Sequence, residues 1–230
     1  MKLLAIDAST KVAGAALMEE GALVCECNLT SGLTQSEKLL PLIDQCLKLA
    51  GWQPGEIDVF AAVAGPGSFT GVRIGVSTVK GMAEAHGRPV VAVGTLEVLA
   101  AAFPAFDGMV VPILDARRAE VYSAAYRDGA EVLPPAPRAL AALLADPAIT
   151  GPVLFCGDGV PPYRAAIEEA LGERAHFAPP HLLLQRAGAA AWLAWRKAAA
   201  GDTMDAATLL PDYLRLSQAE QARARQEGTL

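Results

Sequence analysis

One short pattern occurs once in each half of the chain, and it constrains the fold more than any other feature. Ile6-Asp7-Ala8 ends an apolar segment near the start of the chain, and Leu114-Asp115-Ala116 ends a second one. In both places two polar residues follow, and then another apolar segment begins. Apolar segments separated by tight polar turns are typical of paired strands. A pattern that opens two halves of comparable length predicts a duplicated unit.

The first half has the pattern of three strands followed by alternating helices and strands. The expected strands cover 3–8, 12–18, 22–28, 58–64 and 89–93, and the expected helices cover 36–50, 70–85 and 95–102. Two residues compete to cap the first helix. Thr34 has capping-box spacing to Glu37, whereas Pro41 fits better near the first turn, which favours Ser36. This order of elements predicts a ribonuclease-H-like α/β layer.

The second half repeats the beginning, with strands expected at 109–114 and 119–126. The proline-rich stretch Leu133–Pro137 and a turn at 157–162 then interrupt it, and helices are expected at 163–171, 186–200 and 217–226. The predicted fold class is therefore α/β, with two ribonuclease-H-like lobes around a cleft, as in actin, sugar kinases and the 70-kilodalton chaperones. We expect a first lobe at 1–103, a smaller second lobe at 104–216, and a C-terminal helix in 217–230 that packs back on the first lobe.

Composition narrows the class of partner. The chain has 230 residues, of which 53% are hydrophobic, so it can fill a core and is not disordered. Its 19 basic and 25 acidic residues give a formal net charge of −6. Since phosphate neutralisation supplies most of the affinity for nucleic acid, a primary RNA-binding role is not expected. No apolar run reaches the ~20 residues of a membrane helix, so we expect a soluble, cytoplasmic protein without a membrane partner.

The glycine-rich segment 65–75, Gly-Pro-Gly-Ser-Phe-Thr-Gly-Val-Arg-Ile-Gly, stands between an expected strand and an expected helix. Gly65 and Gly67 permit positive φ or close backbone approach, and Ser68 or Thr70 can cap the helix. Backbone N–H groups at such a helix start suit an anion. The segment is neither a Walker loop nor a dinucleotide fingerprint, because the Gly-Lys-Ser/Thr ending and the fingerprint spacing are missing. Both an anion site and a purely structural turn remain open.

The aspartate at the end of the first strand has two readings as well. Asp7 could orient a magnesium-bound water, or it could cap its own turn through an Asx hydrogen bond. We favour the cap, because Ala8 stands where nucleotide-binding proteins of this fold commonly have glycine. The candidate residues of a vestigial anion site are Asp7, Ser9, Thr10, Gly65, Gly67 and Ser68.

The cysteines and histidines predict no metal site. Cys25 and Cys27 alternate along an expected strand and share one face, while Cys46 and Cys156 are expected far away as buried free thiols. None of the three histidines, His86, His176 and His181, stands four residues from another, which a helical metal-binding pair requires.

Two first-half helices carry broad apolar faces. The candidate interface residues are Leu39, Leu42, Ile43 and Cys46 on the first helix, and Gly71, Val72, Gly75 and Val79 on the second. Glycines four apart share a face and permit close helix approach, which favours docking of another chain. Packing of both helices against their own sheet explains the same pattern, and the residues alone do not decide between the two.

The eleven-residue segment 65–75 resembles the hallmark of the TsaB, or YeaZ-type, proteins of bacterial threonylcarbamoyladenosine synthesis. The resemblance continues at Leu4-Ala5-Ile6-Asp7, at Thr34-Gln35-Ser36 with Leu39-Leu40-Pro41, at Asp115-Ala116-Arg117 with Glu120-Val121-Tyr122, and at Pro211-Asp212-Tyr213-Leu214-Arg215. These segments span nearly the whole chain.

This resemblance implies a non-catalytic partner subunit. A TsaD-type (Kae-type) catalytic paralogue would transfer the threonylcarbamoyl group to the adenosine beside the tRNA anticodon, together with a small TsaE-type P-loop ATPase. The chain would form a homodimer in isolation through its helical surface and would meet tRNA only indirectly. It would need no cofactor of its own, although ATP or ADP is compatible with the complex. The alternatives are a small-molecule kinase or ATPase of the same superfamily, or a glycoprotease-like protein.

Overall fold

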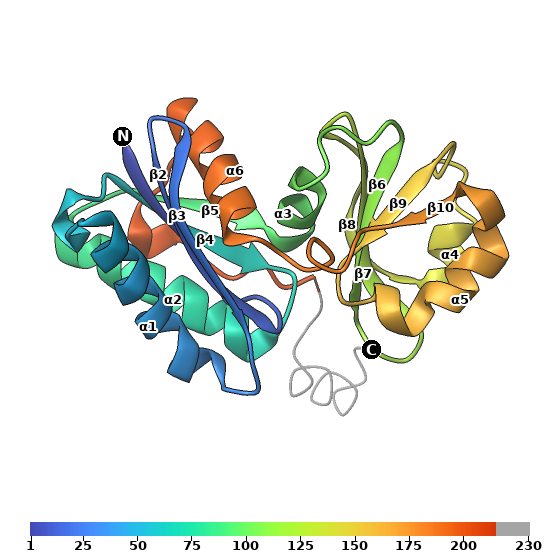
Figure 1. The fold of residues 1–230 in the computed structure, drawn as a ribbon, viewed down its shortest axis with the longest axis horizontal. Helices are drawn as coiled ribbons and strands as arrows, with labels where there is room; N and C mark the ends of the chain where they lie inside the picture. The colour runs from blue at the N-terminus through green and yellow to red at the C-terminus, as the bar shows by residue number, and fades with distance from the viewer. Residues whose placement is uncertain (215–230) are drawn as a thin grey trace, which may run out of the picture.

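The computed structural model describes residues 1–214 as two lobes, each built on a five-stranded sheet (Figure 1). This confirms the predicted duplicated α/β fold. The strands of the first sheet lie in the order β3-β2-β1-β4-β5. They are β1 (Lys2–Asp7), β2 (Val12–Glu19), β3 (Ala22–Thr30), β4 (Val59–Gly65) and β5 (Val90–Gly94).

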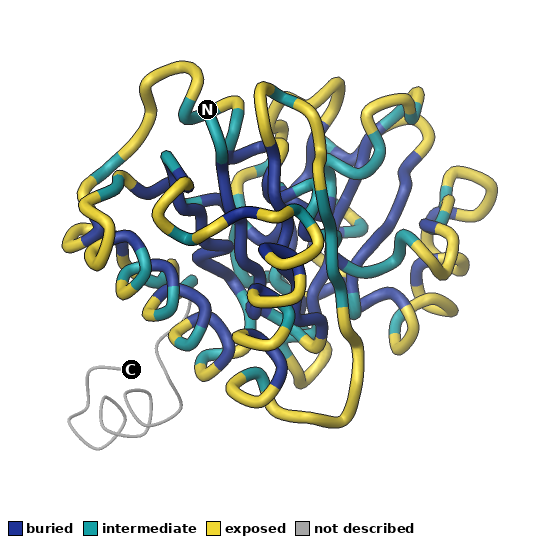
Figure 2. Tube along the Cα trace, turned by 60° about the vertical axis from the view of Figure 1, so that its left-hand side comes forward, coloured by how far each residue is buried: buried dark blue, intermediate teal, exposed yellow. Residues whose placement is uncertain are grey.

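The central strand β1 is buried on both sides of the first sheet. It pairs antiparallel with β2 and parallel with β4. Because side chains alternate along a strand, Leu4 and Ile6 enter one core and Leu3 and Ala5 enter another. Helices α1 (Gln35–Ala50) and α2 (Phe69–His86) cover the first of these faces. Figure 2 shows that buried and exposed residues alternate within each turn of the helices.

The start of α1 decides between the two expected caps. Thr34 is the N-cap, and the Glu37 carboxylate accepts a hydrogen bond from the Thr34 N–H at 2.7 Å. Glu37 also lies at the positive end of the helix dipole. The helix ends at Gly51, which has a φ of 69°, a left-handed conformation that favours glycine.

The second sheet has the same topology as the first, in the order β10-β9-β6-β7-β8. Its central strand β6 also pairs antiparallel with the next strand and parallel with the fourth. The elements are β6 (Met109–Asp115), β7 (Glu120–Arg127), β8 (Ala130–Ala139), α4 (Leu140–Leu144), β9 (Val153–Cys156), α5 (Val160–Leu171) and β10 (Ala175–Phe177). The stretch Leu133–Pro137, expected to interrupt the lobe, lies within β8. Prolines are tolerated there because β8 is an edge strand.

The chain returns to the first lobe earlier than expected. Helix α6 (Ala187–Ala199) packs against the face of the first sheet that α1 and α2 leave uncovered (Figure 1). Met204 then bridges to Val90 of β5. The expected second lobe, 104–216, is therefore wrong at its C-terminal end. Alanines on α6 permit close approach to small residues of the sheet, a match that the helical pattern alone does not identify. The expected helix at 217–226 lies outside the described residues.

Helix α3 (Thr95–Ala101) joins the two lobes. Its Val98 packs into the first-lobe core, and its Leu96 and Leu99 pack into the second. Short 3-10 turns complete the described chain at Pro54–Glu56, Gly172–Arg174 and Ala206–Thr208. Within residues 1–214, no helix is both long enough and apolar enough to cross a bilayer.

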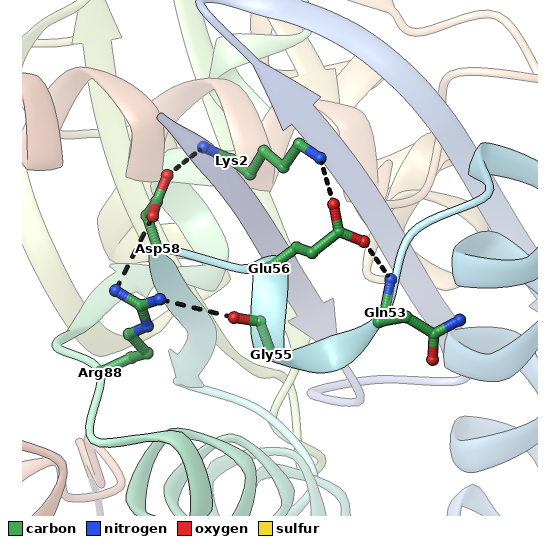
Figure 3. Close-up of polar contacts among 6 residues, drawn as sticks. All are labelled: Lys2, Gln53, Gly55, Glu56, Asp58 and Arg88. Atoms are coloured by element: carbon green, nitrogen blue, oxygen red, sulfur yellow. Dashed lines mark hydrogen bonds and ion pairs between the residues drawn. The ribbon is translucent and has the colours of Figure 1, made fainter.

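A polar network closes the first sheet at the end opposite the Asp7 turn (Figure 3). The Lys2 backbone N–H donates to Asp58 at 2.8 Å, and the Lys2 ammonium donates to Glu56 at 2.8 Å. Arg88 reaches the Gly55 carbonyl at 3.4 Å and lies 3.9 Å from the Asp58 carboxylate. These contacts hold the loop before β4 against the start of β1.

Candidate functional site

Asp7 ends β1 and bonds the turn that follows it. Its Oδ1 accepts from the Ser9 N–H at 2.8 Å and from the Ser9 hydroxyl at 2.7 Å, which is the Asx turn favoured above. The side chain is only 1% exposed. Burial raises the pKa of Asp7 to about 6, although the two bonds from Ser9 act in the opposite direction. Within residues 1–214, no group hydrogen-bonds its second carboxylate oxygen.

The glycine-rich turn packs directly against the Asp7 turn. The Ser68 N–H donates to the Ser9 carbonyl at 2.6 Å. A Cβ atom added at Gly67 would lie 2.0 Å from the Ser9 carbonyl oxygen, and one added at Gly71 would lie 2.1 Å from that of Ala8. Glycine is therefore required at both positions for backbone contact. The Ser68 hydroxyl accepts from the Gly71 N–H at 3.2 Å, so Ser68 and not Thr70 caps α2.

Gly65 contacts the other end of the described chain. It has a φ of 128°, and an added Cβ would lie 2.3 Å from the Asp212 carbonyl oxygen. The Asp212 N–H donates to the Ala64 carbonyl at 2.7 Å. Two motifs far apart in the sequence, the segment 65–75 and the segment 211–215, thus meet through their described residues.

Aromatic and cationic contacts also join the segment 65–75 to the described residues of the segment 211–215. The rings of Phe69 and Tyr213 stack with centroids 4.8 Å apart. The Arg73 guanidinium lies 3.8 Å from the Phe69 ring centroid and donates to the Tyr213 hydroxyl at 2.7 Å. Phe69 and Arg73 therefore hold the C-terminal segment against the start of α2.

Gln185 joins the site without having been predicted. It is 2% exposed and lies just before α6. Its amide nitrogen donates to the Ser9 hydroxyl at 3.3 Å, and its oxygen accepts from the Thr10 hydroxyl at 3.0 Å. No local pattern marks this residue, because its role depends on the path by which the chain returns to the first lobe.

The structure thus brings five of the six candidate residues together. Asp7, Ser9 and Ser68 form one hydrogen-bonded junction against which Gly67 packs, and Gln185 links Thr10 to it. Gly65 contacts Asp212 instead. Each of these contacts is internal to the chain, and binding of an anion at this place stays a prediction.

The candidate interface residues lie inside the first lobe. Leu39, Ile43, Cys46, Val72 and Val79 are between 0 and 3% exposed and belong to the core under the sheet. Gly71 and Gly75 are buried against Ala8, and Leu42 is half-buried. The alternative of internal packing therefore explains the apolar stripes, because both helices turn them towards β1, β2 and β4.

The solvent side of the same helices has a different composition. On α1, Leu40 is 60% exposed and Leu49 is 67% exposed. On α2, the exposed residues include Arg73, Ser77 and Gly81, spaced four apart, and a Cβ added at Gly81 would meet nothing within 4 Å.

One expectation about the cysteines is wrong. Cys46 of α1 lies beside Cys25 and Cys27 of β3, and their three sulfur atoms lie within 4.8 Å of one another. The spacing along the chain concealed this, because only the packing of α1 on β2 and β3 creates the cluster. Cys156 lies alone in the second lobe, buried on β9.

Two of the histidines belong to different lobes. His86, at the end of α2, stacks on Phe60 at a centroid distance of 6.4 Å. His176, on β10, meets Phe106 edge-on at 5.7 Å. The two rings therefore pack against different aromatic side chains, one in each lobe.

A pocket of about 590 Å3 opens between the lobes on the α3 and α6 side. Its lining includes Glu97, Tyr126, Trp192, Arg196 and Lys197. Burial raises the pKa of the Tyr126 hydroxyl, so this group stays a neutral donor. The pocket combines aromatic and cationic groups, but none of the six candidate residues of the anion site lines it.

Comparisons with known proteins agree with the motifs. The family described as TsaD, tRNA N6-adenosine threonylcarbamoyltransferase, matches residues 33–223. The tRNA threonylcarbamoyladenosine biosynthesis protein TsaB of Bacillus subtilis is 34% identical over 225 residues, which cover 96% of each chain. A crystal structure from Pseudomonas aeruginosa, of a protein with similarity to peptidase YEAZ, has a TM-score of 0.79 at 32% identity and covers 93% of this chain and 99% of its own.

A more distant structure shares the fold alone. Component A of the Acidaminococcus fermentans (R)-2-hydroxyglutaryl-CoA dehydratase has a TM-score of 0.53 at 14% identity, and the match covers 86% of this chain and 99% of that one. The near relatives, by contrast, share sequence over almost the whole length. The chain therefore belongs to the TsaB, or YeaZ-type, family of proteins related to the threonylcarbamoyltransferase TsaD.

Proposed function

We propose that this chain acts in the synthesis of threonylcarbamoyladenosine in tRNA, as a non-catalytic subunit that binds a TsaD-type paralogue. The name and the nearly complete overlap of the Bacillus subtilis relative support a role in this pathway. The active complex would also contain a TsaE-type ATPase. The chain itself would meet tRNA only indirectly and require no nucleotide, while ATP or ADP would act elsewhere in the complex.

The observation that carries the non-catalytic assignment is the junction at Asp7. One carboxylate oxygen is bonded by the turn at Ser9, and the glycine-rich turn bonds the same Ser9 backbone. A phosphate held by the glycine-rich turn would have to replace contacts that the fold uses internally. The separate positions of His86 and His176 further disfavour a histidine metal centre. These features support a partner role over the kinase, ATPase and glycoprotease-like alternatives.

The partner surface in this proposal is the solvent side of α1 and α2. Leu40 and Leu49 supply exposed apolar contact, and Ser77 and Gly81 permit a second helix to approach closely. The same side would form the homodimer when the paralogue is absent, so self-association and binding of the paralogue should compete.

Copurification with the TsaD-type paralogue, followed by a tRNA modification assay with each subunit omitted in turn, tests the assignment. We expect a stable complex, and we expect modification to stop when this chain is left out. Full modification without it, or robust ATP hydrolysis by the isolated chain, would contradict the proposal.

The surface is tested by Gly81→Leu with Ala166→Leu as its matched control. Gly81 faces open space, so leucine should not disturb the monomer, but it should obstruct helix approach and weaken association about tenfold or more, equivalent to ~1.4 kcal/mol. Ala166 is also exposed, on α5 of the other lobe. If both variants bind the paralogue as tightly as the unmodified chain, the α1–α2 side is not the interface.

A further inference from the structure

The three-cysteine cluster lies where α1 crosses the edge of the first sheet. Cys25 and Cys27 are two residues apart on β3, so their side chains share one face, and Cys46 of α1 packs over that face. Cys25 and Cys27 are half-buried, whereas Cys46 is fully buried. The three sulfurs lie within 4.8 Å of one another, and the Cys46 thiol donates to the Ala15 carbonyl at 3.4 Å. Among residues 1–214, no other group of histidine, cysteine or acidic ligands is so arranged.

These distances suit one metal ion bound by three sulfurs. With Zn–S bonds of about 2.3 Å, tetrahedral geometry sets the sulfurs about 3.8 Å apart. Closing from 4.8 Å requires a movement of about 1 Å at most, within the reach of side-chain rotation. The half-exposed Cys25 and Cys27 leave the solvent side open, where a water molecule can complete the tetrahedron.

We propose that Cys25, Cys27 and Cys46 form a binding site for a single thiophilic divalent ion, Zn2+, which links α1 to the edge strand β3. Binding releases three thiol protons and gives a zinc–tris-thiolate with one bound water and a net charge of −1. Soft thiolate ligands select zinc over magnesium or calcium. Burial raises the pKa of the Cys46 thiol and of the Cys25 thiol, so these two stay protonated without the ion. This site departs from the expectation of no metal, and it does not depend on the proposed role in tRNA modification.

The test is a titration of the full, reduced chain with Co2+ under anaerobic conditions, followed by displacement with Zn2+. We expect one equivalent of Co2+ to produce a thiolate-to-cobalt charge-transfer band that one equivalent of Zn2+ removes. Cys25→Ser and Cys27→Ser should each weaken binding about tenfold or more, because a hydroxyl is a poor ligand for these ions. Cys156→Ser, which changes a buried cysteine outside the cluster, should bind as the unmodified chain does.

Thermal melting supplies a second measurement. Zn2+ in excess should raise the Tm of the unmodified chain and of Cys156→Ser, since an ion that binds only the folded state stabilises it. Cys25→Ser and Cys27→Ser, at half-exposed positions, should fold normally but lose this increase. Lack of a thiolate band, or zinc binding that both serine variants retain, would overturn the site; retained binding of several equivalents would identify adventitious metal.

Discussion

The two lobes share one topology but bury equivalent residues to different degrees. Asp7 and Asp115 each end a central strand, and each Oδ1 accepts from the N–H two residues later, at 2.8 Å and 2.9 Å. Asp7 is buried, whereas Asp115 is half-buried and also accepts from the Tyr163 hydroxyl at 3.1 Å. The same local turn therefore has two environments, because different segments cover it.

The first glycine after the fourth strand is closely packed in both sheets, since an added Cβ would lie 2.3 Å from the Asp212 carbonyl oxygen at Gly65 and 2.2 Å from the Ile113 carbonyl oxygen at Gly157. The second glycine differs, because the added Cβ would lie 2.0 Å from the Ser9 carbonyl oxygen at Gly67 but 3.0 Å from that of Ile113 at Gly159. In the first lobe the return of the chain through Gln185, α6 and residues 211–213 closes the junction from outside. Duplicated topology thus conserves one tightly packed glycine in each turn, while the packing at the second glycine differs between the lobes.

The largest expected effect comes from adding a side chain at Gly67, which is more closely packed than Gly159. Gly67→Ala should cost about 3 kcal/mol or more, because the methyl group meets backbone that cannot move independently. Gly159→Ala should lower the free energy of unfolding by about 1 kcal/mol, since small shifts of the neighbouring atoms bring its contacts to ordinary van der Waals distances. Urea denaturation followed by circular dichroism measures both. Equal losses would show that the two glycine positions are equally tight.

Titration of Asp7 should give the next largest effect. Its pKa is about 6 in the folded chain and near 3.8 when exposed, so the folded state binds this proton more tightly. The resulting stability is fully present below about pH 4 and is lost as the pH rises through 6. Between pH 4 and pH 8 the free energy of unfolding of the unmodified chain should fall by about 1–3 kcal/mol more than that of Asp7→Asn.

The comparison is between Asp7→Asn and the unmodified chain at each pH. Free energies of unfolding from denaturant series at several pH values separate the cases. A pH-independent difference for Asp7→Asn would contradict the burial argument.

The smallest expected effect concerns arginines stacked on aromatic rings in each lobe. Arg73 lies over Phe69 and bonds Tyr213, while Arg164 lies 4.1 Å from the Phe177 ring centroid and pairs with Glu168 at 2.9 Å. Arg73→Ala should lower stability by about 1 kcal/mol and Arg164→Ala by about 0.5 kcal/mol, as both stacks are exposed.

Limited proteolysis distinguishes these two variants further. Arg73→Ala should speed cleavage near residues 211–213, because the side chain holds that segment on α2, whereas Arg164→Ala should leave the cleavage rate there unchanged. Faster cleavage in both variants would mean general destabilisation rather than release of this contact.

Much of the local structure followed from patterns along the chain. The repeat at Asp7 and Asp115 predicted two similar lobes because polar turns between apolar segments are set locally. The spacing of Thr34 and Glu37 included the correct cap, and Gly65 and Gly67 marked a close backbone approach. Each of these signals depends on neighbouring residues, so the sequence by itself determined them.

Tertiary structure alone decided which surfaces meet. The apolar residues of the two helices, such as Leu39 and Val79, were compatible with an internal core and with an interface. Only the packing of the helices on the sheet shows that they belong to the core. Cys46 joined Cys25 and Cys27, and Gln185 reached Ser9, through contacts between segments distant along the chain. Helical and strand periods specify which residues share a face, but not which other segment covers that face. That choice arises from the simultaneous packing of all the elements, and no single stretch of this sequence contains it.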